Sequence, residues 1–339
     1  HKLSIDEIGP TVRGIGRAGA GVNNIPVAAC TERGIPVFNA PGANANAVKE
    51  LVIAGLLLGS RGIIEGIDYA RSLRGMDDYQ AMNVLLEKEK KQFKGNELLG
   101  HTLGVVGLGA IGSKVAKTAL MLGMDVIGYD PALSVEAAWR LPAEVKRMEH
   151  LSALFSRADY VTLHLPALES TLKLVGERAL GNFKEGAVLL NFSRDEIVDV
   201  EAIKQAMVSG RLGRYVSDFP HPELLDVPGN LCMPHIGAST GEAEENCAIM
   251  VARQLRDFLE NGNIRNSVNF PALELERTGG PRLAITNSNV PNMLGQVTSV
   301  LADAEINVVD LLNKSRDTVA YNLIDVEAAP GEDVLQQLA

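Results

Sequence analysis

The sequence has little that would suit a secreted, membrane-bound or nucleic-acid-binding protein. Its 339 residues include only three cysteines, Cys30, Cys232 and Cys247. Their spacing matches neither a Cys-x-x-Cys motif nor an even disulfide framework. We therefore expect reduced structural thiols in an intracellular protein, and no metal site. The formal net charge is -10 and no basic run of nucleic-acid type is present, which argues against a nucleic acid as the main partner.

Long hydrophobic runs are also missing. The longest apolar stretch, residues 51–59, falls well short of the roughly 20 residues that span a bilayer, so it predicts a buried helix. Residues 1–6 lack the apolar core of a secretory signal peptide. These two absences lead us to expect a cytoplasmic protein without a membrane partner. Trp139 is the only tryptophan, and nothing places it in a site.

The length of the chain and its alternating pattern predict several α/β domains. A chain of 339 residues suggests about two or three domains. Short apolar runs alternate with helical patterns, which predicts a parallel, doubly wound sheet. Residues 270–281 contain the proline and glycine of a linker. Beyond them, a strand at 282–286, a helix at 292–304 and strands at 306–312 and 319–326 form a predicted β-α-β-β unit.

A glycine-rich motif at residues 107–112 has the spacing of a dinucleotide-binding turn, between a predicted strand and a predicted helix. In such a motif Gly107 permits the tight turn, Gly109 lets the backbone approach the pyrophosphate, and Gly112 allows close helix–strand packing. Asp130 closes the next apolar run, 21 residues after Gly109. A carboxylate there would bind the adenosine ribose hydroxyls and repel the extra phosphate of NADP. The sequence therefore predicts NAD as the cofactor.

Three polar clusters, residues 191–194, 218–223 and 234–240, each follow a strand-like run. Parallel sheets place their ligands at the carboxyl ends of the strands, so we expect these clusters to converge near the nicotinamide. An arginine there could bind a carboxylate through two parallel hydrogen bonds. A histidine could take and return a hydroxyl proton. A glutamate bonded to the second imidazole nitrogen would fix the tautomer and raise the histidine's pKa.

Each candidate taken alone also has an ordinary structural explanation. Arg194 could form a surface ion pair, Glu223 could be a solvated loop acid, and His235 could be a satisfied histidine beside a proline. Their order along the chain and their places at strand ends favour the catalytic interpretation.

With these motifs the chain resembles the D-isomer-specific 2-hydroxyacid dehydrogenases, over nearly the whole sequence from Val12 onward. The resemblance implies an α/β protein in which residues 96–240 form a doubly wound, Rossmann-type NAD domain. Residues 1–95 and 241–270 would form a flavodoxin-like substrate domain, with a cleft between the two lobes. Residues 281–339 would form a small α+β regulatory domain of the ferredoxin-like ACT type. We expect sequence to be missing at both ends.

The resemblance also assigns roles to individual residues. It implies catalytic roles for Arg194, Glu223 and His235. The substrate would be bound by Arg17, Gly19, Asn44, Arg194 and His235, with Arg17 at its anionic end. The residues implied to bind NAD are Gly107, Gly109, Ala110, Ile111, Gly112, Asp130, Leu165, Phe192, Ser193, Arg194, Asp218, His235, Gly237 and Ala238.

An ACT domain favours the members that oxidise 3-phosphoglycerate at the start of L-serine biosynthesis, since lactate, glycerate and formate relatives normally lack it. Asn289 and Asn307 match positions that hold serine in regulated members. The apolar helix at residues 51–58 and the edge of such a domain both suggest a homodimer or homotetramer.

Several positions depart from the family pattern. Asn46 stands where some members carry a phosphate-binding arginine, Asp195 replaces a usual glycine, and the interval from Glu223 to His235 is short. Phosphate recognition would then fall to Arg17, to lysines in residues 88–94, or to residues missing from the N-terminus. Other departures from the serine-binding loop are Asn287 and Asn292.

Two alternative functions remain open from the sequence. One is a general 2-keto acid reductase for hydroxypyruvate, glyoxylate or 2-oxoglutarate, because Arg194 and His235 would serve any 2-keto acid. The other is an NAD-responsive regulatory binding protein.

Overall fold

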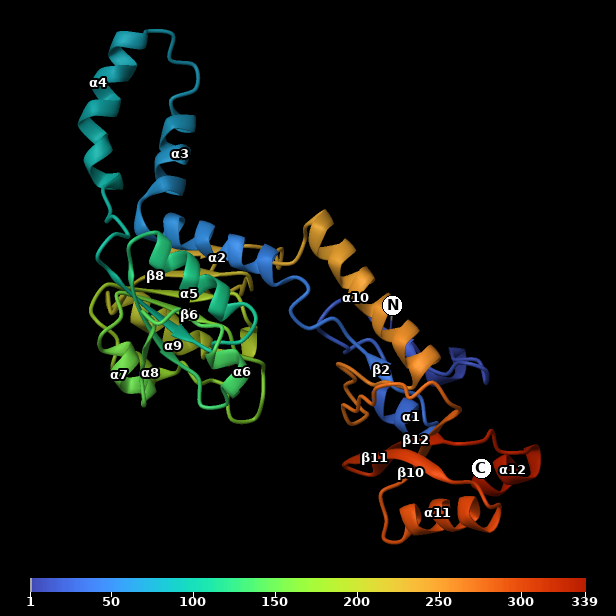
Figure 1. Ribbon diagram of the computed structural model, residues 1–339. Helices are drawn as coiled ribbons and strands as arrows, with labels where there is room; N and C mark the ends of the chain where they lie inside the picture. The colour runs from blue at the N-terminus through green and yellow to red at the C-terminus, as the bar shows by residue number, and fades with distance from the viewer. Residues whose placement is uncertain (1) are drawn as a thin grey trace. The chain divides into compact units, whose positions relative to one another are not determined.

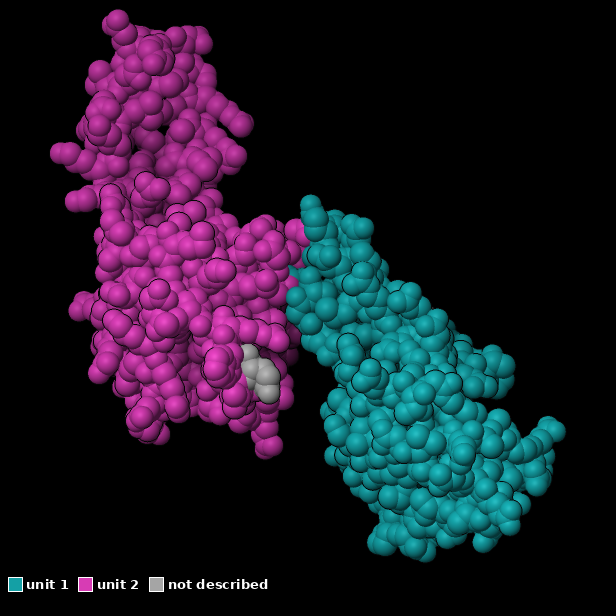
Figure 2. Space-filling model, viewed as in Figure 1, with its two compact units in different colours: residues 1–44, 241–339 teal, residues 45–240 magenta. Residues whose placement is uncertain are grey.

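The computed structural model describes residues 2–339, apart from the side chain of Glu136. The chain divides into two compact units, residues 45–240 and residues 1–44 together with 241–339 (Figure 2). We call them the sheet unit and the terminal unit. Residues 45–95 pack with the sheet unit, whereas the predicted domains place them with residues 241–270. The predicted domain boundaries stay a prediction.

A seven-stranded parallel sheet forms the centre of the sheet unit, in the order β5-β4-β3-β6-β7-β8-β9. The strand order reverses beside β3, which pairs with β4 on one side and β6 on the other. This is the doubly wound topology, whose ligands bind at the carboxyl ends of the strands near that reversal. The strands are β3 Thr102–Val106, β4 Asp125–Tyr129, β5 Lys146–Arg147, β6 Tyr160–Leu163, β7 Ala187–Asn191, β8 Leu212–Ser217 and β9 Asn230–Cys232.

Helices cover both faces of this sheet (Figure 1). One apolar core joins the sheet to α2 (Ala45–Ser60) and α5 (Gly112–Met121). The other core joins it to α7 (Leu151–Phe155), α8 (Glu177–Leu180) and α9 (Val200–Val208). Burial on both faces explains the continuous apolar runs of the central strands. The short α6 spans Val135–Ala138.

The predicted buried helix at residues 51–59 lies within α2. Val52 and Leu56 are fully buried against the sheet, whereas Leu57 is exposed. Within the described part of the chain, none of the helices combines the length and the apolar character that crossing a membrane requires.

Two further helices, α3 (Ile63–Ser72) and α4 (Tyr79–Glu89), project from the sheet unit and are followed by the 3-10 turn η2 (Lys90–Phe93) (Figure 1). Neither helix contains a buried residue. The lysine-rich end of this hairpin forms surface ion pairs, such as Lys90 with Glu87.

The terminal unit contains two small sheets. Strands β1 (Ile15–Gly16) and β2 (Val37–Phe38) pair in parallel, and α10 (Gly241–Asn261) packs on them. A Cβ at Gly16 would lie 2.2 Å from the Val251 side chain, so only glycine allows this approach. The remaining short elements of this region are η1 Ile5–Glu7 and α1 Val27–Glu32.

The C-terminal segment forms an antiparallel sheet in the order β10-β12-β11. Apolar residues pack against both of its faces, so β12 is buried along its whole length. This sheet, with the parallel sheet of the other unit, confirms the predicted α/β class with a small C-terminal antiparallel sheet. The elements are β10 Arg282–Ser288, α11 Met293–Asp303, β11 Val308–Arg316, β12 Val319–Val326 and α12 Glu332–Leu338.

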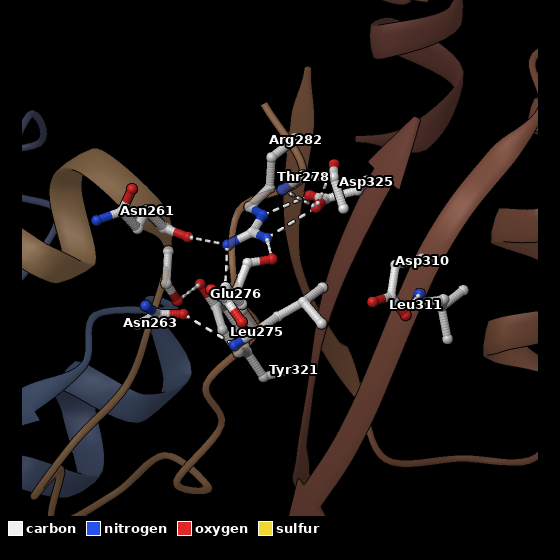
Figure 3. Close-up of polar contacts among 11 residues, drawn as sticks. Asn261, Asn263, Leu275, Glu276, Thr278, Arg282, Asp310, Leu311, Tyr321 and Asp325 are labelled. Carbon is white, nitrogen blue, oxygen red and sulfur yellow. Dashed lines mark hydrogen bonds and ion pairs between the residues drawn. The ribbon is translucent and has the colours of Figure 1, made fainter. Parts of the chain in front are cut away.

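A buried ion pair ties this C-terminal sheet to the rest of its unit (Figure 3). The side chains of Arg282 and Asp325 are 3% and 1% exposed and are joined by two hydrogen bonds, one of them 2.8 Å long. The guanidinium also donates to the carbonyl oxygens of Asn261, Leu275 and Glu276 at 2.9–3.0 Å. The hydrogen bonds and the positive charge of Arg282 lower the pKa of Asp325. One side chain thus joins α10, the linker and β12.

Replacing Arg282 by Ala should therefore destabilise the terminal unit. The substitution leaves a buried carboxylate without its cation, which costs about 3–5 kcal/mol of unfolding free energy. Arg265, which pairs with Glu274 at the surface, is the matched control, and Arg265→Ala should cost less than about 1 kcal/mol. Urea denaturation measures both variants. Equal losses of unfolding free energy in the two variants would show that burial does not strengthen the contribution of the Arg282–Asp325 pair to stability.

Candidate functional site

The predicted polar clusters lie at the carboxyl edge of the parallel sheet, as expected. The glycine turn follows β3, Asp130 follows β4, and the clusters that begin at Asn191, Asp218 and Pro234 come at or shortly after the ends of β7, β8 and β9. Because these strands are neighbours with the same direction, their ends share one edge of the sheet unit.

The glycine turn after β3 excludes side chains at two positions. Gly107 has φ +90° and donates its N–H to the Tyr129 carbonyl oxygen at 2.8 Å. Only glycine adopts this conformation without strain. A Cβ at Gly112 would lie 1.9 Å from the carbonyl oxygen of Gly107. These two residues are therefore required by the packing of β3 against α5.

Gly109 differs from its neighbours, because a Cβ there would meet no protein atom within 4 Å. The fold itself does not explain a glycine at this position. The first turn of α5 follows, and its N-cap residue, Ile111, supplies no side-chain hydrogen bond. Free N–H groups at a helix N-terminus and open space beside Gly109 match the needs of a dinucleotide pyrophosphate. The residues present thus fit the predicted cofactor.

Asp130 is held in place by the same turn. One carboxylate oxygen accepts the Leu108 N–H at 2.8 Å and the other accepts the Ala132 N–H at 3.0 Å. Each carboxylate oxygen retains acceptor capacity. The side chain is therefore oriented at the end of β4 and can still accept hydrogen bonds from ribose hydroxyls.

Ser193 connects the ends of β6 and β7. Its hydroxyl donates to the Leu163 carbonyl oxygen at 2.7 Å and accepts the Leu165 N–H at 2.9 Å. Phe192 beside it is buried against α2, where a Cβ at Gly55 would lie 2.9 Å from its ring. Three of the predicted cofactor residues, Leu165, Phe192 and Ser193, therefore also build the edge of the sheet.

Asp218 organises the segment that carries His235. Its carboxylate is 2% exposed and accepts the N–H groups of Ile236 and Gly237 at 2.8 and 2.7 Å. The His235 N–H donates to the Asp218 carbonyl oxygen at 2.9 Å. Two charge-assisted hydrogen bonds thus fix the backbone on the C-terminal side of the histidine.

His235 itself has an uncommon backbone conformation, with φ +58°. Non-glycine residues in this left-handed region persist when the surrounding structure holds them there. The imidazole is exposed, and its ring centroid lies 4.9 Å from that of Phe219 in an edge contact. Asp218 and Phe219 therefore orient a histidine that solutes can reach.

Arg194 lies at the end of β7, before the 3-10 turn η3 (Asp195–Ile197). Its backbone is fixed by the Asn191 amide, which donates to the Arg194 carbonyl oxygen at 2.9 Å. The guanidinium donates to the Ser193 carbonyl oxygen at 2.6 Å through one nitrogen. The side chain is exposed, and its other donors are available to an anion.

Glu223 is exposed, and its N–H donates to His221 Nδ1 at 3.4 Å. Within the described part of the chain its carboxylate makes no hydrogen bond with His235. The predicted Glu223–His235 pair stays a prediction.

His164 is a half-buried polar residue at this edge that the sequence did not identify. Its Nε2 lies 2.9 Å from the Thr162 hydroxyl, while Nδ1 is buried and lacks a partner within residues 2–339. Burial lowers the pKa of His164 to about 3, so the ring is neutral at physiological pH. A Cβ at Gly107 would lie 2.3 Å from the His164 carbonyl oxygen, so this residue also shapes the glycine turn.

The predicted substrate residues Arg17 and Gly19 belong to the terminal unit. Gly19 has φ +147°, and a Cβ there would lie 1.6 Å from the Arg17 guanidinium, which folds over it. The Arg17 N–H donates to the Phe38 carbonyl oxygen at 2.9 Å. Asn44 immediately precedes α2. Their roles toward a substrate stay predictions.

Asn46, at the position of a family arginine, donates through its amide to Glu50 at 2.8 Å. This hydrogen bond lowers the pKa of Glu50. Among the predicted serine-binding residues, Asn289 donates its side-chain amide to the Asp317 carbonyl oxygen at 3.0 Å. Asn307 is exposed, and its carbonyl oxygen accepts the Glu327 N–H at 3.0 Å. Nothing in these contacts tests the predicted serine site.

The family that matches this sequence and the similar known proteins agree on the kind of enzyme. Residues 66–237 match the family described as "D-isomer specific 2-hydroxyacid dehydrogenase, NAD binding domain". The chain is 35% identical over 304 residues to D-3-phosphoglycerate dehydrogenase of Methanocaldococcus jannaschii, covering 88% of this chain and 55% of the relative. It is 33% identical over 345 residues to D-3-phosphoglycerate dehydrogenase of Haemophilus influenzae, covering 98% and 80%. The chain thus spans little more than half of the first relative.

Solved structures show the same likeness. A glyoxylate reductase from Paecilomyes thermophila superposes with a TM-score of 0.64 and 27% identity, covering 78% of this chain and 77% of that one. The NAD-bound 3-phosphoglycerate dehydrogenase of Entamoeba histolytica superposes with a TM-score of 0.60 and 29% identity, covering 77% and 76%.

The two glycines at the turn should respond differently to substitution. Gly109→Ala should leave the thermal unfolding temperature unchanged and weaken NAD binding at least about tenfold, because the added methyl group occupies only the space near the pyrophosphate. Gly112→Ala should lower the unfolding temperature as well, because its methyl group meets a backbone oxygen. Differential scanning fluorimetry and fluorescence titration with NADH measure the two effects. A stable Gly112→Ala variant with unchanged affinity would contradict this account of the turn.

Proposed function

Because the chain belongs to the D-isomer specific 2-hydroxyacid dehydrogenases, which are NAD-binding oxidoreductases, we propose that it oxidises D-3-phosphoglycerate to 3-phosphooxypyruvate. This reaction is the first step of L-serine biosynthesis. The observation that carries the proposal is the placement of Arg194, Asp218 and His235 at the carboxyl ends of three adjacent parallel strands. An anion-binding arginine and an exposed histidine there provide the groups that oxidation of a 2-hydroxy acid needs.

Each group has a defined task in the proposed reaction. Arg194 binds the substrate carboxylate through its free donors and so orients the second carbon. His235 removes the hydroxyl proton as general base and returns it in the reverse direction. When bound, NAD supplies the acceptor for the hydrogen and two electrons that leave the second carbon. Glu223, if it pairs with the imidazole, favours the protonated ring that this step produces.

Asp218 acts as a positioning residue in this scheme. Its carboxylate holds the Ile236 and Gly237 N–H groups and so fixes the direction of the His235 side chain. Loss of that direction would lower turnover even with the imidazole present, because proton transfer needs a short, aligned contact.

The choice of 3-phosphoglycerate as substrate is supported by the names of the curated relatives and by the small antiparallel sheet at the C-terminal end of the chain. Arg17 would supply positive charge toward the phosphate, in place of the arginine replaced by Asn46. The same sheet would bind L-serine through Asn289 and Asn307 and support a homodimer or homotetramer.

A general 2-keto acid reductase is the second candidate, and the likeness to a glyoxylate reductase favours it. The substrates separate the two functions. Oxidation of NADH should be at least about tenfold more efficient, in kcat/KM, with 3-phosphooxypyruvate than with hydroxypyruvate, glyoxylate or 2-oxoglutarate, since a phosphate contact is charge-assisted. Equal or greater efficiency with the unphosphorylated acids would establish the general reductase. No turnover with any of them would favour an NAD-responsive regulatory protein.

The role of His235 is best tested with asparagine. Asn tolerates the left-handed backbone but cannot act as a general base. His235→Asn should therefore lower kcat by about 100-fold or more and change the dissociation constant of NADH by less than about threefold. Steady-state kinetics and fluorescence titration provide the two values. Undiminished turnover in this variant would remove His235 from the mechanism.

A further inference from the structure

A polar cavity in the terminal unit contains a buried amide that the described structure leaves without partners. The cavity has a volume of about 600 Å³ and lies along one face of α10, beside Ala43 and the turn at Asn266. All of its lining residues belong to the terminal unit. Its size falls within the roughly 300–1,000 Å³ of small-molecule sites. None of the residues assigned above to catalysis or to substrate binding lines it.

Gln254 is the buried amide in question. It is 6% exposed, and neither its oxygen nor its nitrogen has a hydrogen-bond partner within residues 2–339. Buried side-chain polar atoms are nearly always hydrogen-bonded, because an unpaired one carries the full cost of desolvation. Asn269 in the same unit is 8% exposed, and its amide bonds to Thr31, Ile35 and Val37. Gln254 therefore lacks the hydrogen-bond partners that the same unit provides for the buried amide of Asn269.

The charges around the cavity are unevenly paired. The acidic side chains that line it are engaged, since Asp257 accepts from the Asn261 and Asn263 amides and Glu260 lies 4.0 Å from Arg256. Arg253 is exposed and has no acidic or hydrogen-bonding partner in the described part of the chain. One free guanidinium and one free amide thus adjoin the same cavity.

Two neighbouring stripes of α10 line the cavity. Residues four apart on a helix lie one above the other. Met250 stands one turn before Gln254, and Ile249 stands one turn before Arg253. The cavity therefore has an apolar part formed by Ile249, Met250 and Ala43, next to the two free polar groups.

From this arrangement we propose that the cavity binds a small organic acid that carries a hydroxyl or keto group, or a second carboxylate, a few bonds from its carboxylate. The Arg253 guanidinium binds the carboxylate through paired hydrogen bonds. The Gln254 amide both donates and accepts, so it binds the second polar group. The carbon chain lies on the apolar residues. This ligand site is additional to the proposed catalytic site, and it does not depend on the identity of the dehydrogenase substrate.

The test is isothermal titration calorimetry of the full chain with D-lactate, L-malate and 2-oxoglutarate, each compared with acetate, which lacks a second polar group. The titrations use the Arg194→Ala background, which removes the proposed catalytic carboxylate contact. At least one of the three acids should bind one-to-one and more tightly than acetate. If none binds, or if binding occurs only with Arg194 intact, the proposal is wrong.

Three further substitutions, each in the same background, locate the bound acid. Arg253→Gln, at an exposed position, should raise the dissociation constant at least about tenfold. Gln254→Leu should abolish binding while leaving the unfolding temperature of the free protein equal or higher, since it removes an unpaired buried amide. Arg178→Gln, at an exposed position of the sheet unit, is the control and should change nothing. Unchanged affinity in both Arg253→Gln and Gln254→Leu would overturn the site.

The proposed acid site and the proposed dehydrogenase activity can fail independently of each other. Turnover of NADH by the unsubstituted chain tests the catalytic residues and does not depend on Arg253 or Gln254. If the cavity holds only water, no titration with these acids produces heat of binding, and the dehydrogenase assay is unaffected.

Discussion

Parallel hydrogen bonding between β3, β6, β7 and β8 determines where the polar residues of the sheet unit lie. The four strands run in the same direction, so all of them end at one edge of the sheet. Segments more than a hundred residues apart in sequence therefore meet just after the strands. The glycine turn, Ser193 and Asp218 come together for this reason, and hydrogen bonds to Asp218 bring the His235 segment beside them. The apolar cores on both faces keep the strands in that register and leave only the edge polar.

Within that edge, the proposed catalytic residues are held through their backbones, by hydrogen bonds to neighbouring side chains. Asp218 binds two successive N–H groups, Ser193 joins two strand ends, and the Asn191 amide holds the carbonyl of Arg194. Side chains that act on a substrate need free donors or lone pairs. Because other residues fix the backbones of Arg194 and His235, the guanidinium and the imidazole stay available.

Much of this edge could be predicted from the sequence, because the spacing of Gly107, Gly109, Gly112 and Asp130 has a local physical cause. The polar clusters after strands could be predicted for the same reason. His164 and Gln254 could not. His164 continues an apolar run and Gln254 lies in a helix rich in charged residues, so their burial depends on segments distant in the chain.

The left-handed backbone at His235 has a consequence for how this chain tolerates variation. Glycine is the residue best suited to φ +58°, and it is also one that would remove the imidazole. Substitutions that relax the backbone at this position therefore eliminate the proposed chemistry. If His235 acts as the proposed general base, stability and turnover make opposite demands on this residue. A related chain that lacks the proposed activity should therefore carry glycine or asparagine at the position of His235 while the surrounding loop is still unchanged.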